Sequence, residues 1–168
     1  HVDDCPLLAS RIFDYDHQRW ETAYFLARFV TGLRKVVVPG RKALDEELHL
    51  LAKTVTGFVP AIIHRDFQSQ NIMVRGGVPR VIDFQGARVA PPAYDVASIL
   101  WDPYRRIDDT MRERLLAYYI EEMKKEAREF DERSFFNTLL PCRLQRHMQA
   151  LGAYGFLSVI KGKKYFLK

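Results

Sequence analysis

Apolar side chains recur at helical spacing through the first third of the chain. Residues 18–33 form one such stretch, in which aromatic and small residues share a face and Gly32 lies near the end. Residues 42–55 form a second, with leucines and a valine three or four positions apart, followed by Gly57 and Pro60. The pattern predicts two helices in this region.

The pattern changes to short β-branched runs between Ala61 and Val89. Three strands are predicted, at Ile62–Ile63, Ile72–Val74 and Arg80–Ile82. Gly76 and Gly77 separate the second run from the third, as in a tight hairpin. Polar residues in the loops of such an insert are the first place to look for function, because loops on a rigid scaffold carry most binding and catalytic groups.

Helical spacing returns after Pro91 and Pro92. The helices are predicted over Tyr94–Trp101, Thr110–Arg128 and Glu132–Ile160. Pro141 is predicted to break the last of them, and Gly152 and Gly155 are further candidate breaks. The predicted fold class is α+β, mostly helical, with a small β-hairpin insert that bears the functional loops.

One loop of the insert has the spacing of a kinase catalytic loop. His64-Arg65-Asp66 is followed, after four residues, by Asn71, and Asp83 follows the last predicted strand in an Asp-Phe-Gln turn. Phosphoryl transfer needs one carboxylate to orient the attacking hydroxyl and oxygen ligands to hold Mg²⁺ against the phosphates. The alternative is that the three polar residues only cap turns. Their joint spacing between β-branched runs favours the catalytic interpretation.

Three motifs carry a family resemblance. They are His-Arg-Asp-Phe-Gln-Ser-Gln-Asn at 64–71, Ile-Asp-Phe-Gln-Gly-Ala at 82–87 and Pro-Ala-Tyr-Asp-Val-Ala-Ser-Ile-Leu at 92–100. The block 58–102 resembles the aminoglycoside phosphotransferase and choline kinase superfamily, and these motifs are similar to bacterial N-acetylmuramate/N-acetylglucosamine anomeric kinases. The resemblance implies that residues 1–168 are the C-terminal lobe of a protein-kinase-like fold. It also implies an ATP- and Mg²⁺-dependent transfer of a phosphoryl group to a small-molecule hydroxyl.

The resemblance assigns reaction roles to five residues. Asp66 would be the catalytic base that orients the hydroxyl, and Asn71 and Asp83 would be the Mg²⁺ ligands. Met73 and Ile82 would form the apolar floor beneath the adenine of ATP.

The resemblance also implies supporting and substrate-facing residues. His64, Arg65 and Asp95 would support the site, with the His64 ring tying the loop to the Asp83 turn and Asp95 accepting backbone N–H groups of the loop. Asp95 can also be interpreted as a simple N-cap, and both interpretations place it at the start of the next helix without conflict. Gln68 and Glu21 are candidates for contacts with the acceptor. Solvent exposure is the alternative for Gln68, and a charged helix face is the alternative for Glu21.

Composition and charge limit the kinds of ligand and partner that the sequence favours. The chain has 168 residues, 48% hydrophobic and 28% charged, as in soluble globular proteins, with a net charge of +5. A basic chain suits a neutral or anionic amino sugar better than a polycationic aminoglycoside, which remains the alternative acceptor. Nucleic acid is disfavoured, because the basic residues near the C-terminus lack an interleaved aromatic platform. No apolar run is long enough for a membrane span, so a cytoplasmic protein with reduced Cys5 and Cys142 is predicted.

Two sets of kinase motifs are missing from the sequence, and their absence bears on which kind of kinase this chain could be. Only residues 84–94 separate the metal turn from the next helix, without an Ala-Pro-Glu sequence, which disfavours a protein kinase. Neither a glycine-rich phosphate loop nor a Val-Ala-Ile-Lys strand occurs, so the chain, which begins at His1, is predicted to be a piece of a longer kinase. A pseudokinase-like binding module is the alternative from another class. Apolar surface around Met73 and Ile82 makes a homodimer a further expectation.

Overall fold

Two compact structural units make up the chain, and each is assembled from two separate segments. The computed structural model describes residues 6–163. The mixed unit comprises the chain up to Ile12 together with Phe58–Arg143. The helical unit comprises Phe13–Gly57 together with the chain from Leu144 onward.

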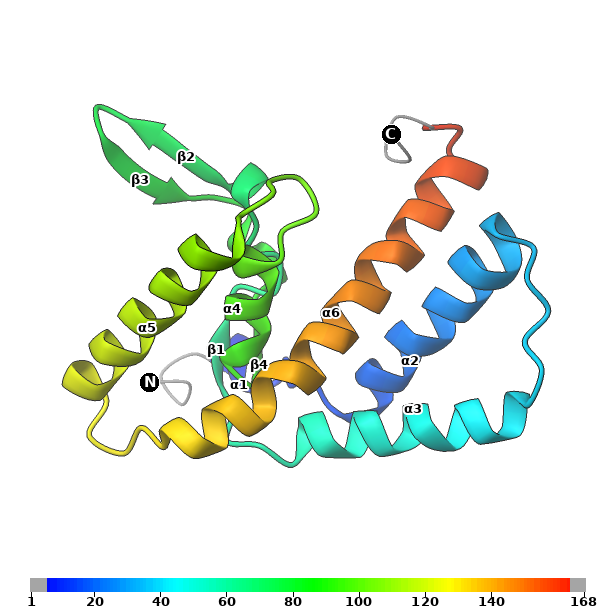
Figure 1. The fold of residues 1–168 in the computed structure, drawn as a ribbon, viewed down its shortest axis with the longest axis horizontal. Coiled ribbons are helices and arrows are strands. Elements are labelled where there is room, and N and C mark those ends of the chain that lie inside the picture. Colours follow the sequence, from blue (N-terminus) through cyan, green and yellow to red (C-terminus); the bar gives the residue numbers. More distant parts are fainter. Residues whose placement is uncertain (1–5, 164–168) are drawn as a thin grey trace. The chain divides into compact units, whose positions relative to one another are not determined.

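The mixed unit combines short strands with helices (Figure 1). Its helices are α1 (Pro6–Ala9), α4 (Ala93–Leu100), α5 (Asp109–Glu126) and the first part of α6 (Glu132–Val159). Its strands are β1 (Ala61–Ile63), β2 (Ile72–Arg75), β3 (Val78–Val81) and β4 (Arg88–Ala90). Two 3₁₀ turns, η3 (Ser69–Asn71) and η4 (Phe84–Gly86), interrupt the loops between them. This composition agrees with the predicted α+β, mostly helical class.

The strands form two separate antiparallel pairs. β2 and β3 make the predicted hairpin, with Ile72 opposite Val81, and both turn glycines have positive φ (60° for Gly76 and 77° for Gly77). β1 pairs with β4, which the local pattern did not predict. The parallel bridge between Ile12 and Val89 extends this second pair.

Helix α4 is the buried centre of the mixed unit. Most of its side chains are apolar and enclosed, which is expected of a helix that is hydrophobic on nearly every side. The buried ones are Ala93, Tyr94, Val96, Ala97, Ser98 and Leu100. An element so enclosed is a rigid support for the loops that are bonded to it.

The helical unit contains α2 (Tyr15–Phe25), η2 (Leu26–Leu33), α3 (Arg41–Thr56) and the second part of α6. Asp14 caps α2 by accepting a hydrogen bond from the N–H of His17 (3.0 Å). The helix predicted over 18–33 is present, but its second half, η2, is a π-helix rather than an α-helix. A π-helix of this length is uncommon, and apolar periodicity alone does not distinguish it from an α-helix.

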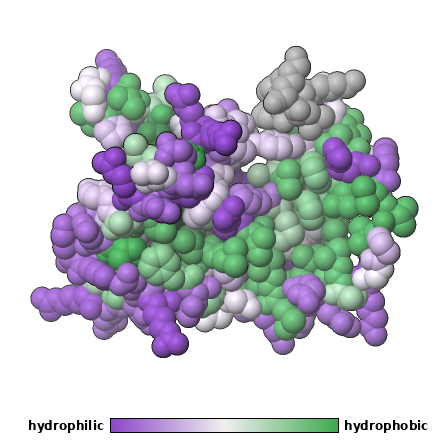
Figure 2. Space-filling view, in the orientation of Figure 1, coloured by the Kyte–Doolittle hydropathy of each residue, from purple (hydrophilic) through white to green (hydrophobic). Residues whose placement is uncertain are grey.

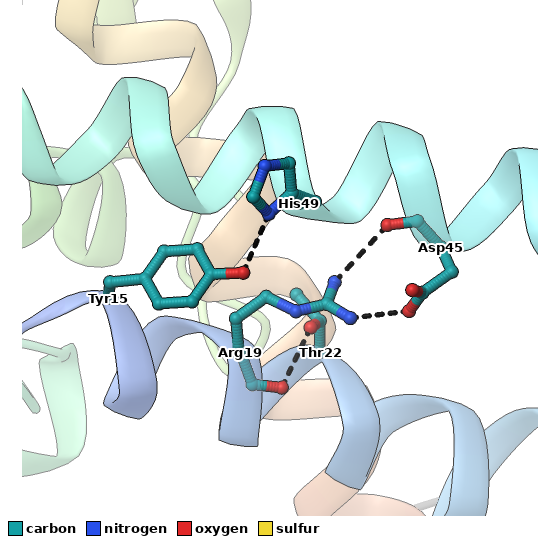
Figure 3. Close-up of polar contacts among 5 residues, drawn as sticks. All are labelled: Tyr15, Arg19, Thr22, Asp45 and His49. Carbon is teal, nitrogen blue, oxygen red and sulfur yellow. Dashed lines mark hydrogen bonds and ion pairs between the residues drawn. The ribbon is translucent and has the colours of Figure 1, made fainter.

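Polar contacts join α2 to α3 (Figure 3). The guanidinium of Arg19 donates to the carboxylate and the carbonyl oxygen of Asp45, and the Tyr15 hydroxyl lies 2.7 Å from Nδ1 of His49. Thr22 donates back to the carbonyl of Arg19 (2.9 Å). These bonds fix the two helices in register along one side of the helical unit.

The predicted breaks in α6 are wrong, because the helix is continuous from Glu132 to Val159 with Pro141 inside it. In the mixed unit, Phe135, Leu139 and Cys142 bury one face of α6 on both sides of the proline. Tertiary packing of that face outweighs the local cost of one missing helical hydrogen bond.

The two glycines of α6 serve helix packing within the helical unit. A Cβ added to Gly152 would lie 2.7 Å from the Tyr24 ring, and one added to Gly155 would lie 2.8 Å from the Phe29 nitrogen and closer still to the Arg28 carbonyl. Figure 1 shows α6 running beside α2 here. None of the helices within residues 6–163 is long and apolar enough to cross a membrane.

Candidate active site

The loop that follows β1 is anchored by a carboxylate on α4. Asp95 accepts the N–H of His64 through Oδ2 (2.5 Å) and the N–H of Arg65 through Oδ1 (2.9 Å). Asp95 lies in the first turn of α4 as predicted, but Pro92 is the N-cap, so the interpretation of Asp95 as the N-cap itself is wrong. Burial raises the pKa of Asp95, and the two backbone hydrogen bonds oppose this increase.

A second carboxylate, which the sequence analysis missed, holds the other end of the same loop. Asp102 is only 6% exposed and accepts the N–H of Ser69 through Oδ2 (2.6 Å). Its other oxygen accepts the N–H of Tyr104 (2.8 Å). The only signal in the sequence is an aspartate directly after an apolar helix. The loop is therefore clamped at both ends by carboxylates that bond its main chain.

Two hydrogen bonds of Asn71, one from its side chain and one to its main chain, bring together the loops of the three reaction residues. The side-chain amide nitrogen of Asn71 donates to the carbonyl of Asp66 (2.8 Å). The N–H of Ile82 donates to the carbonyl of Asn71 (2.9 Å), which places the main chain just before Asp83 beside the same loop. A Cβ added to Gly86 would lie 3.7 Å from Oδ2 of Asp66, which places the turn after Asp83 close to the Asp66 carboxylate.

The His64 ring makes a second link between the two loops. Its Nε2 lies 2.9 Å from the carbonyl oxygen of Ile82, and the ring packs on Phe67 with 6.0 Å between centroids. Because a carbonyl oxygen can only accept, Nε2 must carry the proton in this contact. The His64 ring thus links the loop that carries Asp66 to Ile82, the residue before Asp83.

Two residues of the site have left-handed backbones without being glycine. Arg65 has φ 74° and Asp83 has φ 67°. Asp83 precedes η4, and its carboxylate accepts a hydrogen bond from the side-chain amide of Gln85. Arg11 donates to the carbonyl of Gln85 (2.7 Å). Strained backbone of this kind persists where surrounding bonds over-determine it, and it is concentrated at functional sites.

The side chains in these loops fit a magnesium ion by their donor chemistry. Asp83 offers carboxylate oxygens, and Asn71 offers its amide oxygen because its amide nitrogen is used by Asp66. Within residues 6–163, no group of three or more His, Cys, Asp and Glu side chains is placed to hold a metal. One carboxylate plus one amide matches the few protein ligands that Mg²⁺ takes in phosphoryl-transfer sites, where water and phosphate complete its shell.

The comparison with known proteins decides the family. The profile of the phosphotransferase enzyme family matches residues 1–130. The chain belongs to this family. An N-acetylmuramate/N-acetylglucosamine kinase of Neisseria meningitidis serogroup B (strain ATCC BAA-335 / MC58) is 29% identical to it over 135 residues. That match covers 74% of the chain, which spans 40% of the length of the curated relative. The resemblance read from the central motifs is confirmed.

The β2–β3 hairpin presents apolar side chains to solvent. Met73 on β2 is 55% exposed and Ile82, just after β3, is 43% exposed. Val74, Val78 and Val81 are exposed beside them, and Figure 2 shows this hydrophobic surface on the hairpin. An adenine floor is one use for such a surface, and that role for Met73 and Ile82 stays a prediction.

Gln68 and Glu21, the two residues predicted to contact the acceptor, have different surroundings. Gln68 is half-buried, and its main chain turns the loop through bonds to Asp66 and Asn71 (2.9 Å each). Glu21 is fully buried in the helical unit, so the alternative of a solvated helix face is wrong. A contact of either side chain with the acceptor stays a prediction.

An apolar cavity of about 520 Å³ lies beneath the catalytic-type loop of the mixed unit. His64, Phe67, Asp95 and Tyr119 are among the residues that line it. The pKa of Tyr119 is raised by burial and by the charge of Asp95. Apolar side chains such as Val96 and Leu100 also line this cavity, so Asp95 lies in largely apolar surroundings, and its burial raises its pKa.

Proposed function

We propose that this phosphotransferase chain is the C-terminal lobe of a kinase-like fold and transfers the γ-phosphate of ATP to a hydroxyl of an amino sugar. The observation that carries the proposal is the bonding of Asn71 to both loops. It joins the loop of Asp66 to the turn of Asp83 through two hydrogen bonds. A carboxylate for the hydroxyl and oxygen ligands for Mg²⁺ are thereby available in neighbouring loops.

In this proposal Asp66 orients the attacking hydroxyl and accepts its proton as the new oxygen–phosphorus bond forms and the bond from the γ-phosphorus to the leaving ADP breaks. Asp95 and Asp102 position Asp66 by holding the main chain of its loop. Asn71 and Asp83 hold Mg²⁺, which when bound would neutralise charge on the phosphates. Met73 and Ile82 offer the apolar surface on which an adenine ring would lie.

The name of the relative and the net charge of the chain support an amino sugar as the acceptor. The kinase of Neisseria meningitidis is named for two amino sugars, one of which carries a carboxylate. The net charge of +5 favours a neutral or anionic acceptor over a polycationic one. The sequence has no glycine-rich phosphate loop or strand lysine, so we further propose that a separate N-terminal lobe clamps ATP.

The test measures Mg²⁺-ATP turnover by the protein in its full-length form on N-acetylmuramate, N-acetylglucosamine and an aminoglycoside. We expect turnover of an amino sugar, with kcat lowered about 10²- to 10⁴-fold by Asp66→Asn through loss of the base. Glu113→Gln, at an exposed position of α5, is the matched control and should leave kcat unchanged. Preference for the aminoglycoside would correct the acceptor, whereas unchanged turnover in Asp66→Asn would refute the assignment of the base.

A further inference from the structure

The cavity of about 520 Å³ in the mixed unit has the size and the lining of a small-molecule site. Pockets that bind small ligands typically have volumes of about 300–1,000 Å³ and apolar walls, with a few polar groups that orient the ligand. Side chains from β1, β3, α4 and α5, and from the loop that carries Asp66, line this cavity. All of these elements belong to the mixed unit, so the cavity lies within one compact body.

The walls of the cavity are mostly apolar. Val96 and Ile99 of α4 and Leu115 of α5 contribute branched side chains, and Phe67 and Tyr119 contribute aromatic rings. A flat apolar ligand makes many close contacts with such rings and methyl groups. Close-packed protein interiors have few voids larger than a water molecule, so a cavity of this size against the core helix α4 favours a ligand.

The cavity is accessible from solvent on one side. Ile62, Val81 and Leu115 line it and are exposed, whereas Val96 and Leu100 line it and are buried. A ligand can therefore enter between the exposed side chains and reach the buried face of α4.

Tyr119 and Asp95 give the cavity a polar end. Both line it, and the charge of Asp95 is close enough to raise the pKa of the Tyr119 hydroxyl. Among residues 6–163 the Tyr119 hydroxyl has no hydrogen-bond partner, and each Asp95 oxygen accepts one backbone N–H, which leaves a further lone pair on each. A ligand hydroxyl can donate to either residue, whereas Asp95 repels a negatively charged group.

We propose that this cavity binds a small neutral aromatic alcohol, with its rings between α4 and α5 and its hydroxyl towards Tyr119 and Asp95. Asp66, Asn71 and Asp83 are not among the residues that line the cavity, so the site is separate from the reaction residues. Asp95 also accepts the N–H groups that anchor the reaction loop. A ligand that contacts this carboxylate is thus placed to couple its own binding to the position of that loop.

Fluorescence titration of the protein in its full-length form with 2-naphthol tests the site. Nucleotide and sugar are left out, so the result does not depend on turnover. We expect saturable binding, weakened about three- to tenfold by Tyr119→Phe through loss of one hydrogen bond. The same variant should bind naphthalene, which has no hydroxyl, as tightly as wild type does. Tyr118→Phe, at an exposed position of α5 outside the cavity, is the matched control and should leave both affinities unchanged.

The charged analogue 2-naphthoate tests the role of Asp95. Its carboxylate is carried on the same rings, and we expect binding at least about tenfold weaker than that of 2-naphthol because Asp95 repels it. Circular dichroism checks the fold of each variant. If Tyr119→Phe does not fold, Leu115→Gln replaces it and should weaken 2-naphthol about threefold or more through lost apolar contact. Leu140→Gln, at an exposed position of α6 outside the cavity, is then the control.

Three results would overturn the proposal. The first is the absence of saturable 2-naphthol binding, and the second is equal affinity of wild type and Tyr119→Phe, or of 2-naphthol and 2-naphthoate. The third is competitive displacement of 2-naphthol by N-acetylglucosamine or by Mg²⁺-ATP, which would assign the probe to the acceptor or the nucleotide instead.

Discussion

Two aspartates in the mixed unit act on the main chain rather than on a ligand. Asp95 accepts the backbone N–H groups of two adjacent residues, His64 and Arg65. Asp102 accepts those of Ser69 and Tyr104, which are far apart in the sequence. An asparagine at either position could accept only one of the two, because its amide nitrogen would face the other donor. Carboxylates are required here for geometry, and at Asp95 the cost is the burial of a charge beside an apolar cavity.

Asp95→Asn should change how stability depends on pH. The raised pKa means that the folded chain binds a proton at Asp95 more tightly than the unfolded chain, so protonation favours folding as the pH falls. The free energy of unfolding of wild type minus that of Asp95→Asn should therefore increase as the pH falls from 7 towards 3.8, the ordinary pKa of aspartate. At pH 7 the variant should lose about 1–3 kcal/mol through a broken hydrogen bond.

Denaturant unfolding at several pH values measures this difference. Glu113→Gln, at an exposed position, corrects for the loss of one negative charge. A difference that stays constant or decreases as the pH falls would contradict a raised pKa at Asp95.

At the scale of elements, local signals gave the hairpin and the reaction loops but not the elements completed by distant partners. Two glycines and flanking β-branched residues specify β2 and β3 within ten residues of chain. Strand β4 has only three residues and exists because β1 pairs with it from outside that stretch. At Pro141 the local sequence predicts a break, but packing of the α6 face stabilises a continuous helix. The role of Asp102 was not predicted for the same reason as β4, because its partner Ser69 is distant in the sequence.

Gly155→Ala tests the close contact of α6 with the α2–η2 helix. The added Cβ would meet backbone atoms of Arg28 and Phe29, which cannot move aside as a flexible side chain can. We expect a loss of about 1–3 kcal/mol in the free energy of unfolding, as for other overpacked sites. Gly57→Ala is the control in the same unit, since its Cβ would have ordinary contacts of 3.4 and 3.5 Å and its φ is −81°. Equal effects of the two variants would argue against the close contact.

At the scale of the whole molecule, one helix belongs to both units. α6 begins in the mixed unit and ends in the helical unit, with the division after Arg143. Unfolding of either unit would leave part of this helix without its packing partners. We therefore expect the chain to unfold cooperatively rather than in two steps.

Cys142 reports on this cooperativity. It is fully buried in the mixed unit, and burial raises the pKa of its thiol to about 12. Because the thiolate is the reactive form, a disulfide reagent at pH 8 should label it only when the unit opens. Cys5 lies outside the described residues, and Cys5→Ser removes its contribution to labelling.

The measurement compares the denaturant midpoint of Cys142 labelling in the Cys5→Ser chain with the midpoint of helix loss by circular dichroism. Coincident midpoints are expected if the two units unfold together. Labelling that is rapid in native buffer, or that precedes helix loss, would show that the mixed unit opens by itself.

The division of each unit into two segments sets an order for biosynthesis. The chain leaves the mixed unit at Ile12, returns at Phe58 and leaves it again after Arg143. During translation all segments of the mixed unit are therefore available once Arg143 has left the ribosome, while α2 and α3 must wait for the second half of α6. The helical unit is the later of the two to receive all its segments, and its apolar faces are the ones that a chaperone would meet in the nascent chain.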